Sequence, residues 1–339
     1  MTPPRHDEQS IAFDARWIGA HGIGRFAAEM RERLPELTPA PLAGRPSDPV
    51  DPWRLHQWTK RAKPRAFFTP GYNAPWRCGV PYVFCVHDLF HLDVPGEGGL
   101  AHRLYFNMIV KPAGMRAQRV LTISETSRAR ILEWSGWPRE RVRVIPLGVS
   151  AAFSPQGTVH QAARPYLLYV GNLRPHKNVE RLIRAFAAAK IDQSIMLTLV
   201  TRQSPEIMTR INDAGVAQRV EFAPGLDDAA LAARYRGAIA VVMPSLVEGL
   251  GMPALEGMAC GTPVACSGIG APAEVTQDAA LHFDPLSEEA IRDAIERIVA
   301  GLPDQAAKRE RGFARASLYS WERTASIVRE EMQSAAASG

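Results

Sequence analysis

The chain has 339 residues, of which 46% are hydrophobic and 22% are charged, and its formal net charge is +5. This length and balance suit a globular protein of one large or two ordinary α/β domains. They exclude a membrane-spanning protein, because no apolar run approaches the roughly 20 residues that a spanning helix needs. Together with the polar opening MTPPRHDEQS, this leads us to expect a cytoplasmic protein.

Charge is distributed unevenly along the chain. Residues 1–150 hold 21 Lys and Arg against 14 Asp and Glu, a net +7, whereas residues 151–339 hold 19 against 21, a net −2. A basic first half suits an anionic acceptor or an anionic membrane surface, or it reflects scattered, solvated arginine. Nucleic acid is not expected as a partner, since no nucleic-acid-binding motif is present. The four cysteines lack metal-ligand spacing and are expected to be core thiols.

Short apolar runs alternate with helical periodicity in the first half. We expect strands at Ile11–Arg16, Ala66–Thr69, Val80–Val86, Arg119–Ser124 and Arg141–Pro146, and helices at Phe26–Leu34, 101–117 and Glu125–Glu133. Residues 38–52, rich in proline and polar side chains, indicate a loop. Residues 53–63 form a basic amphipathic patch. It could lie on a membrane surface, but we favour a helix whose Trp53 and Trp58 pack inward.

The second half repeats this pattern after residues 150–164, a polar, irregular segment that indicates a hinge. We expect strands at Tyr166–Val170, Ile195–Val200, Val220–Phe222, Ala238–Met243 and Leu281–Asp284. Helices are expected at Val179–Ala189, Asp227–Arg236, Pro253–Cys260, Ser287–Ala300 and from Phe313 onwards. Strands and helices alternating in two halves predict two doubly wound α/β domains with a cleft between them.

Residues 244–264, PSLVEGLGMPALEGMACGTPV, indicate a ligand site. A buried strand, a glycine-bearing loop and a helix start follow one another, so free backbone N–H groups and the positive end of a helix dipole point the same way. That arrangement suits an anion. Glu248 and Glu256 flank the turn, and carboxylates are suited to accept hydrogen bonds from hydroxyl groups. An anion with many hydroxyl groups attached is a nucleotide sugar.

Further candidate residues stand at the ends of other expected strands. GNLRPHKN, residues 171–178, supplies Arg174, whose planar guanidinium can donate two parallel hydrogen bonds, and Lys177, whose ammonium is a compact positive charge. Both groups suit a diphosphate, although Arg174 could equally be a surface residue. His87 follows Val80–Val86 at the edge where open α/β sheets place ligands, or it caps the next turn. Arg202 lies either near the base and phosphates or simply on the surface.

Two glycines open the first expected helix. Gly22 and Gly24 do not have the G-x-G-x-x-G spacing, so no dinucleotide cofactor is predicted. The stretch is either an ordinary tight turn or a loop that approaches phosphate groups.

The carboxylate pair closely resembles the E-x7-E motif of retaining family 4 glycosyltransferases with the GT-B fold. The surrounding residues also fit that motif: Pro244, Ser245, Gly249, Gly251, Pro253, Gly261, Thr262 and Pro263. The resemblance covers nearly the whole chain. It implies two Rossmann-like domains facing each other across a cleft. Residues 1–149 would form the acceptor side, completed by a C-terminal helix 318–336. Residues 150–164 would be the hinge, and residues 165–317 would bind the nucleotide sugar.

The resemblance also implies roles for the candidate residues. Glu256 would hold the ribose hydroxyls, and Glu248 would lie near the hydroxyls of the transferred sugar, with His87 and Lys177 completing the catalytic set. The backbone amides of Leu250, Gly251 and Met252 would face the sugar and diphosphate. The loop of Gly22 and Gly24 would close over the diphosphate, and Arg202 would be a donor-side residue.

One position departs from the family pattern. Relatives often carry arginine directly after the glycine of the GNLRPHKN segment, where this chain has Asn172. Whether Arg174 takes over the role of that arginine stays open.

The implied reaction is a metal-independent, retaining hexosyl transfer without a cofactor, in which the leaving phosphate takes the acceptor proton. GDP-mannose is the best-matched donor, with dTDP-rhamnose and UDP-hexoses open. The acceptor would be lipid-linked or an oligosaccharide in cell-surface polysaccharide biosynthesis, and the enzyme would be peripheral on the inner face of the membrane. The alternatives are a phosphorylase or epimerase of related fold, and a non-catalytic nucleotide-sugar-binding partner of a membrane assembly.

Overall fold

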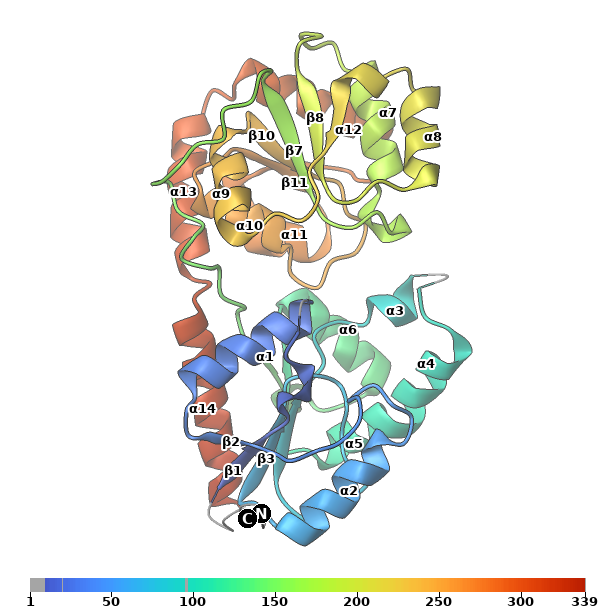
Figure 1. The fold of residues 1–339 in the computed structure, drawn as a ribbon, viewed down its shortest axis with the longest axis vertical. Coiled ribbons are helices and arrows are strands. Elements are labelled where there is room, and N and C mark those ends of the chain that lie inside the picture. The colour runs from blue at the N-terminus through green and yellow to red at the C-terminus, as the bar shows by residue number, and fades with distance from the viewer. Residues whose placement is uncertain (1–9, 20, 95–96, 339) are drawn as a thin grey trace. The chain divides into compact units, whose positions relative to one another are not determined.

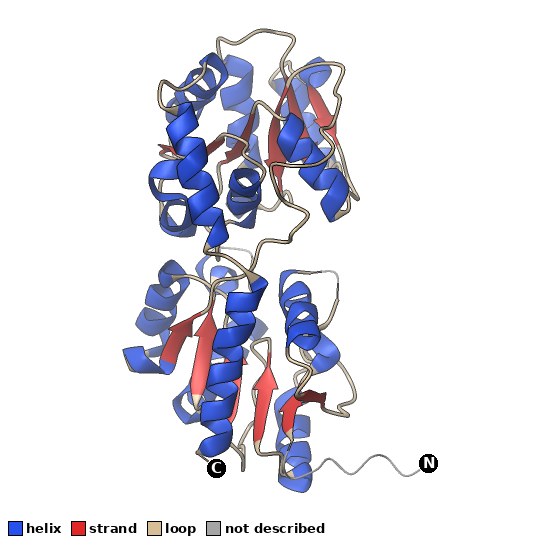
Figure 2. Ribbon diagram, turned by 90° about the vertical axis from the view of Figure 1, so that its left-hand side faces the viewer, coloured by secondary structure: helices blue, strands red, loops and turns tan. Residues whose placement is uncertain are grey.

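The computed structural model describes residues 10–19, 21–94 and 97–338, which divide into two compact units (Figure 1). The N-terminal unit comprises the residues up to Gly148 together with those from Ser320 onwards, and the C-terminal unit is Val149–Tyr319. The polar opening segment 1–9 and Ala20, within the expected glycine loop, lie outside the described residues. Each unit is a parallel sheet with helices on both of its faces (Figure 2), which confirms the doubly wound α/β prediction.

The sheet of the N-terminal unit has the strand order β2-β1-β3-β4-β5-β6. Its strands are β1 (Ile11–Phe13), β2 (Leu37–Pro39), β3 (Ala66–Thr69), β4 (Tyr82–Cys85), β5 (Arg119–Thr122) and β6 (Val142–Val144). The prediction of a loop over residues 38–52 is wrong at its start, because residues 38 and 39 belong to β2, which pairs with β1. That strand has three residues and ends in Pro39, which is tolerated because β2 lies at the sheet edge.

The helices predicted to begin at Phe26, residue 53, residue 101 and Glu125 are present in this unit and start within four residues of those positions. They are α1 (Gly22–Arg33), α2 (Asp51–Ala62), α3 (Phe90–Asp93), α4 (Leu100–Tyr105), the π-helical turn η2 (Phe106–Val110), α5 (Lys111–Arg116), α6 (Glu125–Ser135) and α14 (Trp321–Ala337), with 3-10 turns η1 (Ala15–Trp17) and η3 (Arg139–Arg141). Ser124 caps α6, since its Oγ accepts a hydrogen bond from the backbone N of Ser127 at 3.0 Å.

Residues 53–63 form most of α2 and contain one inward and one outward tryptophan. Trp58 packs against Phe67 with ring centroids 5.6 Å apart, as expected for a helix that covers the sheet. The expectation that both tryptophans pack inward is wrong for Trp53, whose exposed fraction is 62%.

The C-terminal unit has the strand order β12-β11-β10-β7-β8-β9. Its strands are β7 (Tyr166–Val170), β8 (Met196–Val200), β9 (Val220–Phe222), β10 (Ala240–Met243), β11 (Val264–Ser267) and β12 (Leu281–Phe283). Its helices are α7 (Val179–Ala188), α8 (Pro205–Asp213), α9 (Asp228–Gly237), α10 (Met252–Ala259), α11 (Gly270–Thr276), α12 (Glu288–Ala300) and α13 (Gln305–Ser317), with 3-10 turns η4 (Pro175–Lys177), η5 (Ala217–Arg219) and η6 (Gln277–Ala279).

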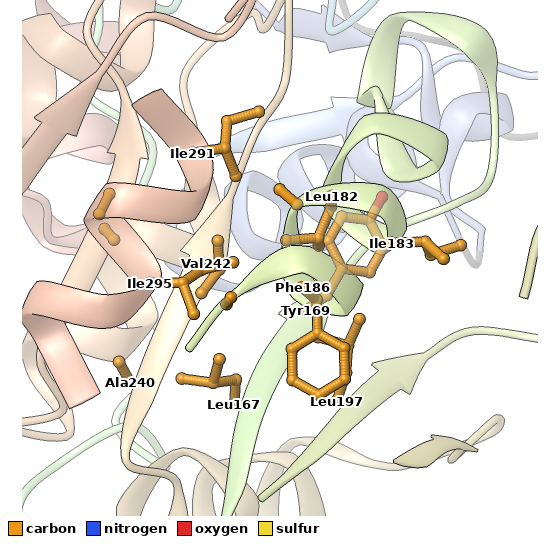
Figure 3. Close-up of a cluster of buried hydrophobic side chains, with 14 of the residues drawn as sticks. Leu167, Tyr169, Leu182, Ile183, Phe186, Leu197, Ala240, Val242, Ile291 and Ile295 are labelled. Atoms are coloured by element: carbon orange, nitrogen blue, oxygen red, sulfur yellow. The ribbon is translucent and has the colours of Figure 1, made fainter. Parts of the chain in front are cut away.

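One apolar core of this unit lies between its sheet and the helices α7 and α12 (Figure 3). Leu182 and Phe186 of α7 and Ile295 of α12 are fully buried against strand residues such as Leu167 and Val242. Burying each such side chain stabilises the fold by about 1.5–3 kcal/mol relative to exposure. This packing holds α7 against the sheet, and with it the loop that precedes α7.

The continuous helix expected from Phe313 onwards is wrong, because the chain breaks at Leu318–Ser320. Helix α13 ends at Ser317, and Ser320 caps a new helix by accepting a hydrogen bond from the backbone N of Arg323 at 3.2 Å. The C-terminal helix therefore begins at Trp321, not at residue 318. It packs on α1, β3 and β4, and the buried Trp321 lies against Gly148.

Candidate functional site

The order of the C-terminal sheet reverses between β7 and β10. From β7 the chain proceeds outward through β8 and β9, and from β10 it proceeds the other way through β11 and β12. Open α/β sheets bind ligands outside the carboxyl ends of the strands at such a reversal. The two loops that leave the sheet here are the 171–178 segment and the 244–251 segment, so the topology brings together the two stretches in which the sequence predicted donor-binding residues.

Lys177 and Glu248 meet at this point as an ion pair. The Lys177 Nζ lies 2.7 Å from Oε1 and 2.8 Å from Oε2 of Glu248. The two side chains retain 16% and 11% of their exposure, so the pair is mostly shielded from solvent but still reachable. A cation and a carboxylate side by side can contact a phosphate group and a sugar hydroxyl of one ligand.

Backbone hydrogen bonds tie the two loops together beneath this pair. The backbone N of Leu246 donates to the carbonyl O of His176 at 2.8 Å. The Asn178 side chain donates to the carbonyl oxygens of Pro244 and Pro285 at 2.9 and 2.8 Å. Asn178 adopts φ 61°, a left-handed conformation that asparagine tolerates better than most residues. Asn178 was not among the predicted site residues, although an asparagine directly before a helix was an available indication.

The N-terminus of α10 faces the same edge of the sheet. Gly251 precedes the helix with φ 102°, a backbone conformation that favours glycine, and no side chain of the described residues caps the first turn. The first N–H groups of a helix have no intrahelical partner and attract anions. The Leu250 side chain is buried, so any contact of Leu250 with a ligand must come from its backbone. Met252 is half-buried.

Glu256 lies one turn into α10 and is only 7% exposed. Its Oε2 accepts a hydrogen bond from the Tyr235 hydroxyl at 2.9 Å. Burial raises the pKa of the Tyr235 phenol well above its usual value, so the phenol stays protonated and donates to Glu256. Tyr235 thus fixes the orientation of a carboxylate that the sequence identified without this partner. A tyrosine in the last turn of α9 gives no local indication of that role.

The two predicted arginines lie on exposed positions of the C-terminal unit. Arg202 follows β8 at the surface. Arg174 lines a depression along α7 and α8, and the residues lining that depression do not include Lys177 or Glu248. The backbone N of Arg174 donates a hydrogen bond to the Asn172 Oδ1 at 3.1 Å. Asn172 therefore shapes the turn that precedes Lys177.

His87 stands directly after β4 in the N-terminal unit. Its Nε2 lies 2.9 Å from the carbonyl O of Pro70, and its ring meets that of Phe26 edge-on at 5.3 Å. Because a carbonyl oxygen only accepts, Nε2 holds the proton and Nδ1 has the lone pair. Burial lowers the pKa of His87 to about 4. The imidazole is therefore neutral at pH 7 and can accept a hydrogen bond from a hydroxyl.

The low pKa of His87 predicts that the free energy of unfolding decreases as the pH becomes acidic. The unfolded chain takes up a proton near pH 6.5, whereas the folded protein does so only near pH 4, so stability is lost as pH falls through this window and is unaffected above it. At pH 5 the loss is about 2 kcal/mol. The free energy of unfolding of wild type and His87→Gln, measured in urea at pH 7.5 and pH 5, checks this. The pKa of His91 is also lowered, but His91 is present in both proteins and contributes equally to each. An equal loss of stability at pH 5 in wild type and His87→Gln would contradict the assignment of this acid sensitivity to His87.

Gly22 and Gly24 lie in the first turn of α1, which His21 caps. The His21 Nδ1 accepts a hydrogen bond from the backbone N of Gly24 at 3.0 Å, a cap that the sequence analysis missed. A Cβ at Gly24 would lie 2.2 Å from the carbonyl O of Gly19, whereas a Cβ at Gly22 would have no atom within 4 Å. Gly24 is thus required by close backbone approach, and Gly22 is not.

This difference predicts opposite outcomes for two alanine variants. Gly24→Ala should lower the melting temperature by several degrees, because the backbone of Gly19 must move, at a cost of about 1–3 kcal/mol. Gly22→Ala should melt within about one degree of wild type, since alanine also favours the helix. Differential scanning fluorimetry of both variants is the measurement. Equal melting temperatures of the two variants would show that the backbone at Gly19 can move away from the new Cβ at no measurable cost in stability.

A buried polar network that the sequence analysis did not predict lies at the order reversal of the N-terminal sheet. Arg16 lies between the carboxylates of Asp14 and Asp51, at 2.7 and 2.6 Å, and the Asn73 amide donates to both at 2.9 Å. Asp14, Asp51 and Asn73 are fully buried. Each carboxylate has charged and neutral donors, which is the condition for burying charge at tolerable cost. The network fixes the loops after β1 and β3, next to His87.

Within residues 10–19, 21–94 and 97–338, no group of three or more His, Cys, Asp or Glu side chains is arranged to hold a metal ion. No helix in the same ranges combines the length and apolarity needed to cross a membrane. The four cysteines, all described, are free thiols, three of them buried.

Comparisons with known proteins find one family model for each of the two units. The family model described as "Glycosyl transferase 4-like domain" matches residues 14–148, and "Glycosyl transferases group 1" matches residues 152–314. The chain is 29% identical over 287 residues to O-antigen chain mannosyltransferase B of Escherichia coli, covering 79% of this chain and 74% of the relative. It spans only 51%, 62% and 61% of the length of three further curated relatives.

Solved structures show the same fold. Sucrose-phosphate synthase of Thermosynechococcus elongatus superposes with a TM-score of 0.77 at 21% identity, covering 98% of this chain and 100% of that one. HepE of Anabaena, in complex with UDP and glucose, superposes with a TM-score of 0.75 at 16% identity, covering 96% and 100%. At these identities the likeness concerns the fold alone.

Proposed function

This chain belongs to the family 4 glycosyltransferases with the GT-B fold, and from that premise we propose which sugar it transfers, to what, and how. The proposed reaction moves a hexose, with mannose from GDP-mannose as the first choice, to a lipid-linked or oligosaccharide acceptor in cell-surface polysaccharide biosynthesis. The choice of mannose is supported by the Escherichia coli relative, which is named as an O-antigen chain mannosyltransferase.

The observation that supports a nucleotide-sugar donor is the Lys177–Glu248 pair at the order reversal of the C-terminal sheet. In the proposed complex, Lys177 and the amides at the start of α10 hold the diphosphate, because both offer positive charge to an anion. Glu256 accepts hydrogen bonds from the ribose hydroxyls, and Glu248 does so from the transferred sugar. Arg174, Arg202, Gly22 and Gly24 stay candidate donor residues.

The proposed chemistry follows from the charges that develop. The bond between the sugar C1 and the phosphate oxygen breaks, a bond from C1 to the acceptor oxygen forms on the same face, and the acceptor proton passes to the leaving phosphate. Lys177 and the α10 amides stabilise the charge on that phosphate as fixed cations and dipoles, so no metal is required in this proposal. Neutral His87 accepts a hydrogen bond from a hydroxyl of the sugar or the acceptor.

Two other donor classes stay open in this proposal. They are dTDP-rhamnose and the UDP-hexoses. Binding of a nucleotide sugar without transfer to any acceptor would instead favour a non-catalytic partner of a membrane assembly.

Thermal shifts test the donor assignment. The melting temperature is measured with GDP, UDP, dTDP and ADP and with their sugar conjugates, with and without EDTA. A shift selective for GDP and GDP-mannose that persists in EDTA and is lost in Lys177→Met is expected, because a ligand that binds the folded state raises its stability. Selectivity for UDP or dTDP would replace mannose as the sugar, and a shift abolished by EDTA and restored by Mg²⁺ would contradict the metal-free proposal.

A product analysis tests the stereochemistry separately. With the donor selected by thermal shift, the anomeric configuration of the newly formed glycosidic bond is determined by NMR. Retention of the donor's configuration is expected. Inversion would require a general base opposite the leaving phosphate and would overturn the same-face route.

A further inference from the structure

A cavity of about 290 Å³ lies within the C-terminal unit, at the amino-terminal edge of its sheet. It is lined by residues 262–264, which lead into β11, and by Ala279, two residues before β12. Because the strands of this sheet are parallel, this edge is opposite to the carboxyl edge at which Lys177 and Glu248 lie. The cavity is therefore separate from the candidate donor site.

The cavity exists because the start of α13 has too little side-chain volume to fill the space beside α10. Helix α13 packs on α10 (Figure 1), and the two come close at Gly312, where a Cβ would lie 3.2 Å from Met258 Cγ. Six residues earlier, the cavity is lined by Ala306, whose side chain is a single methyl group. The long side chain of Lys308 is held by carbonyl oxygens of the 278–280 segment, at 3.0 and 3.3 Å. Protein interiors are normally packed without such a gap, so there is room for a ligand.

The walls of the cavity are largely aliphatic. Met258, Pro263, Val264 and Leu302 line it, and Met258 and Val264 are almost completely buried. A ligand that enters this space removes its own surface and that of these side chains from water, which favours an apolar body. None of the described residues that line the cavity is aromatic, so a ring would find no stacking partner here. The lining therefore suits an aliphatic chain.

Two side chains of α13 that line the cavity offer hydrogen-bond donors to an anion. They are Gln305 and Arg309, one turn apart on the same side of the helix. The Gln305 Oε1 accepts a hydrogen bond from the backbone N of Leu302 at 3.3 Å. The side-chain nitrogen of Gln305 and the exposed Arg309 guanidinium have no partner among residues 10–19, 21–94 and 97–338. Both groups can therefore donate to a carboxylate.

The acidic residues nearest to these donors in the sequence do not line the cavity. Asp304 lies 3.6 Å from Lys308 and 3.3 Å from Arg311, and Asp278 lies 3.2 Å from Arg311, so both carboxylates are already paired. Glu310 is exposed and is not a lining residue. Because no aspartate or glutamate stands among the described residues of the lining, the unpaired charge at the cavity is the single guanidinium. One negative charge on a ligand complements it.

We propose that this cavity binds an aliphatic monocarboxylate, such as a medium-chain fatty acid, with its chain between α10 and α13 and its carboxylate on the Arg309 guanidinium and the Gln305 amide. A partner protein fits the cavity less well, because about 290 Å³ is close to the lower end of small-molecule sites and far smaller than a protein interface. The proposal goes beyond the transfer reaction and does not depend on it, since the cavity shares no residue with the candidate donor site.

Methionine-methyl NMR of the full chain, titrated with octanoate, tests the proposal. The signal of Met258 is identified with Met258→Leu. Ala306→Phe fills the cavity, and its matched control is Ala307→Phe, because the next residue of α13 is exposed and does not line the cavity. Arg309→Gln removes the charge, and its matched control is Arg297→Gln, at an exposed arginine of α12 outside the lining. Melting temperatures confirm that each variant is folded.

In wild type and both controls, the Met258 signal is expected to shift to saturation with octanoate. Hexanoate should bind about tenfold more weakly, because two fewer methylene groups are buried. Ala306→Phe should show no saturable shift. Arg309→Gln should bind octanoate at least about tenfold more weakly and octanol as wild type does, because only the carboxylate loses a charge-assisted hydrogen bond. Lys177→Met, altered at the opposite edge of the sheet, should bind octanoate as wild type does.

Three outcomes would overturn the proposal. A Met258 signal of wild type that does not move up to the solubility limit of octanoate would show that the cavity takes no such ligand. Unchanged octanoate affinity in Ala306→Phe or in Arg309→Gln would show that the carboxylate binds elsewhere. Weaker octanoate binding in Lys177→Met would place the carboxylate at the candidate donor site.

Discussion

Lys177→Met is expected to lower kcat/KM by about 100- to 1000-fold. The substitution removes one charge-assisted hydrogen bond to the diphosphate, worth about 1.5–3 kcal/mol. It also leaves the Glu248 carboxylate, 11% exposed, without the cation that lies 2.7 Å away, so that carboxylate repels the leaving phosphate. Steady-state kinetics with the donor selected by thermal shift is the measurement. A loss below about fivefold would remove Lys177 from the transfer step.

The matched variant is Glu248→Gln, alone and combined with Lys177→Met. In the double variant the unpaired charge is gone, so donor affinity should recover by about tenfold over Lys177→Met, whereas turnover should not, because the contact with the transferred sugar is also lost. If the fold-loss of donor affinity in the double variant equals the product of the two single-variant losses, the two residues act independently despite their contact.

Glu256→Ala is expected to weaken donor binding by about 10- to 100-fold, because the carboxylate no longer accepts hydrogen bonds from the ribose hydroxyls. The variant should also lose about 1–3 kcal/mol of stability, since the buried Tyr235 hydroxyl loses the acceptor 2.9 Å away. Isothermal titration with nucleotide and with nucleotide sugar, beside a urea unfolding curve, measures both effects.

Tyr235→Phe separates the two contributions of Glu256. It removes the positioning hydroxyl and retains the carboxylate, so donor affinity should change by no more than about threefold if Glu256 itself contacts the ribose. If Tyr235→Phe and Glu256→Ala weaken binding equally, the buried hydrogen bond and not a ribose contact explains the effect of Glu256.

Most of the fold could be predicted from local pattern. Parallel strands buried on both faces are continuous apolar runs, and YLLYV at Tyr166–Val170 coincides with β7. The edge strand β2 could not be found in this way, because only Leu37 of its three residues is buried and Pro39 belongs to the proline-rich stretch that indicated a loop. The break at Leu318–Ser320 was missed because apolar spacing continues across it. Ser320 followed by Trp321-Glu322 was the available indication, as serine before an acidic first turn favours a helix start.

The site was predictable in parts but not as an assembly. Sequence pattern identified Lys177 and Glu248 separately, because each follows a strand and precedes a helix. Their ion pair joins residues 71 positions apart and depends on β7 lying beside β10, which is a property of strand order. His21, Asn178 and Tyr235 escaped prediction for the same reason, since each acts through a partner that only the folded chain supplies.

The return of α14 to the N-terminal unit has a consequence for synthesis on the ribosome. Helix α14 supplies Glu331, only 3% exposed, whose carboxylate meets Arg119 and Arg143, and it places Trp321 against Gly148. During synthesis, the surfaces of β3, β4 and α1 that α14 covers therefore stay exposed until the whole C-terminal unit, Val149–Tyr319, has been translated. The N-terminal unit can be completed only after the C-terminal unit has been synthesised, which reverses the usual N-terminal-first order of folding on the ribosome.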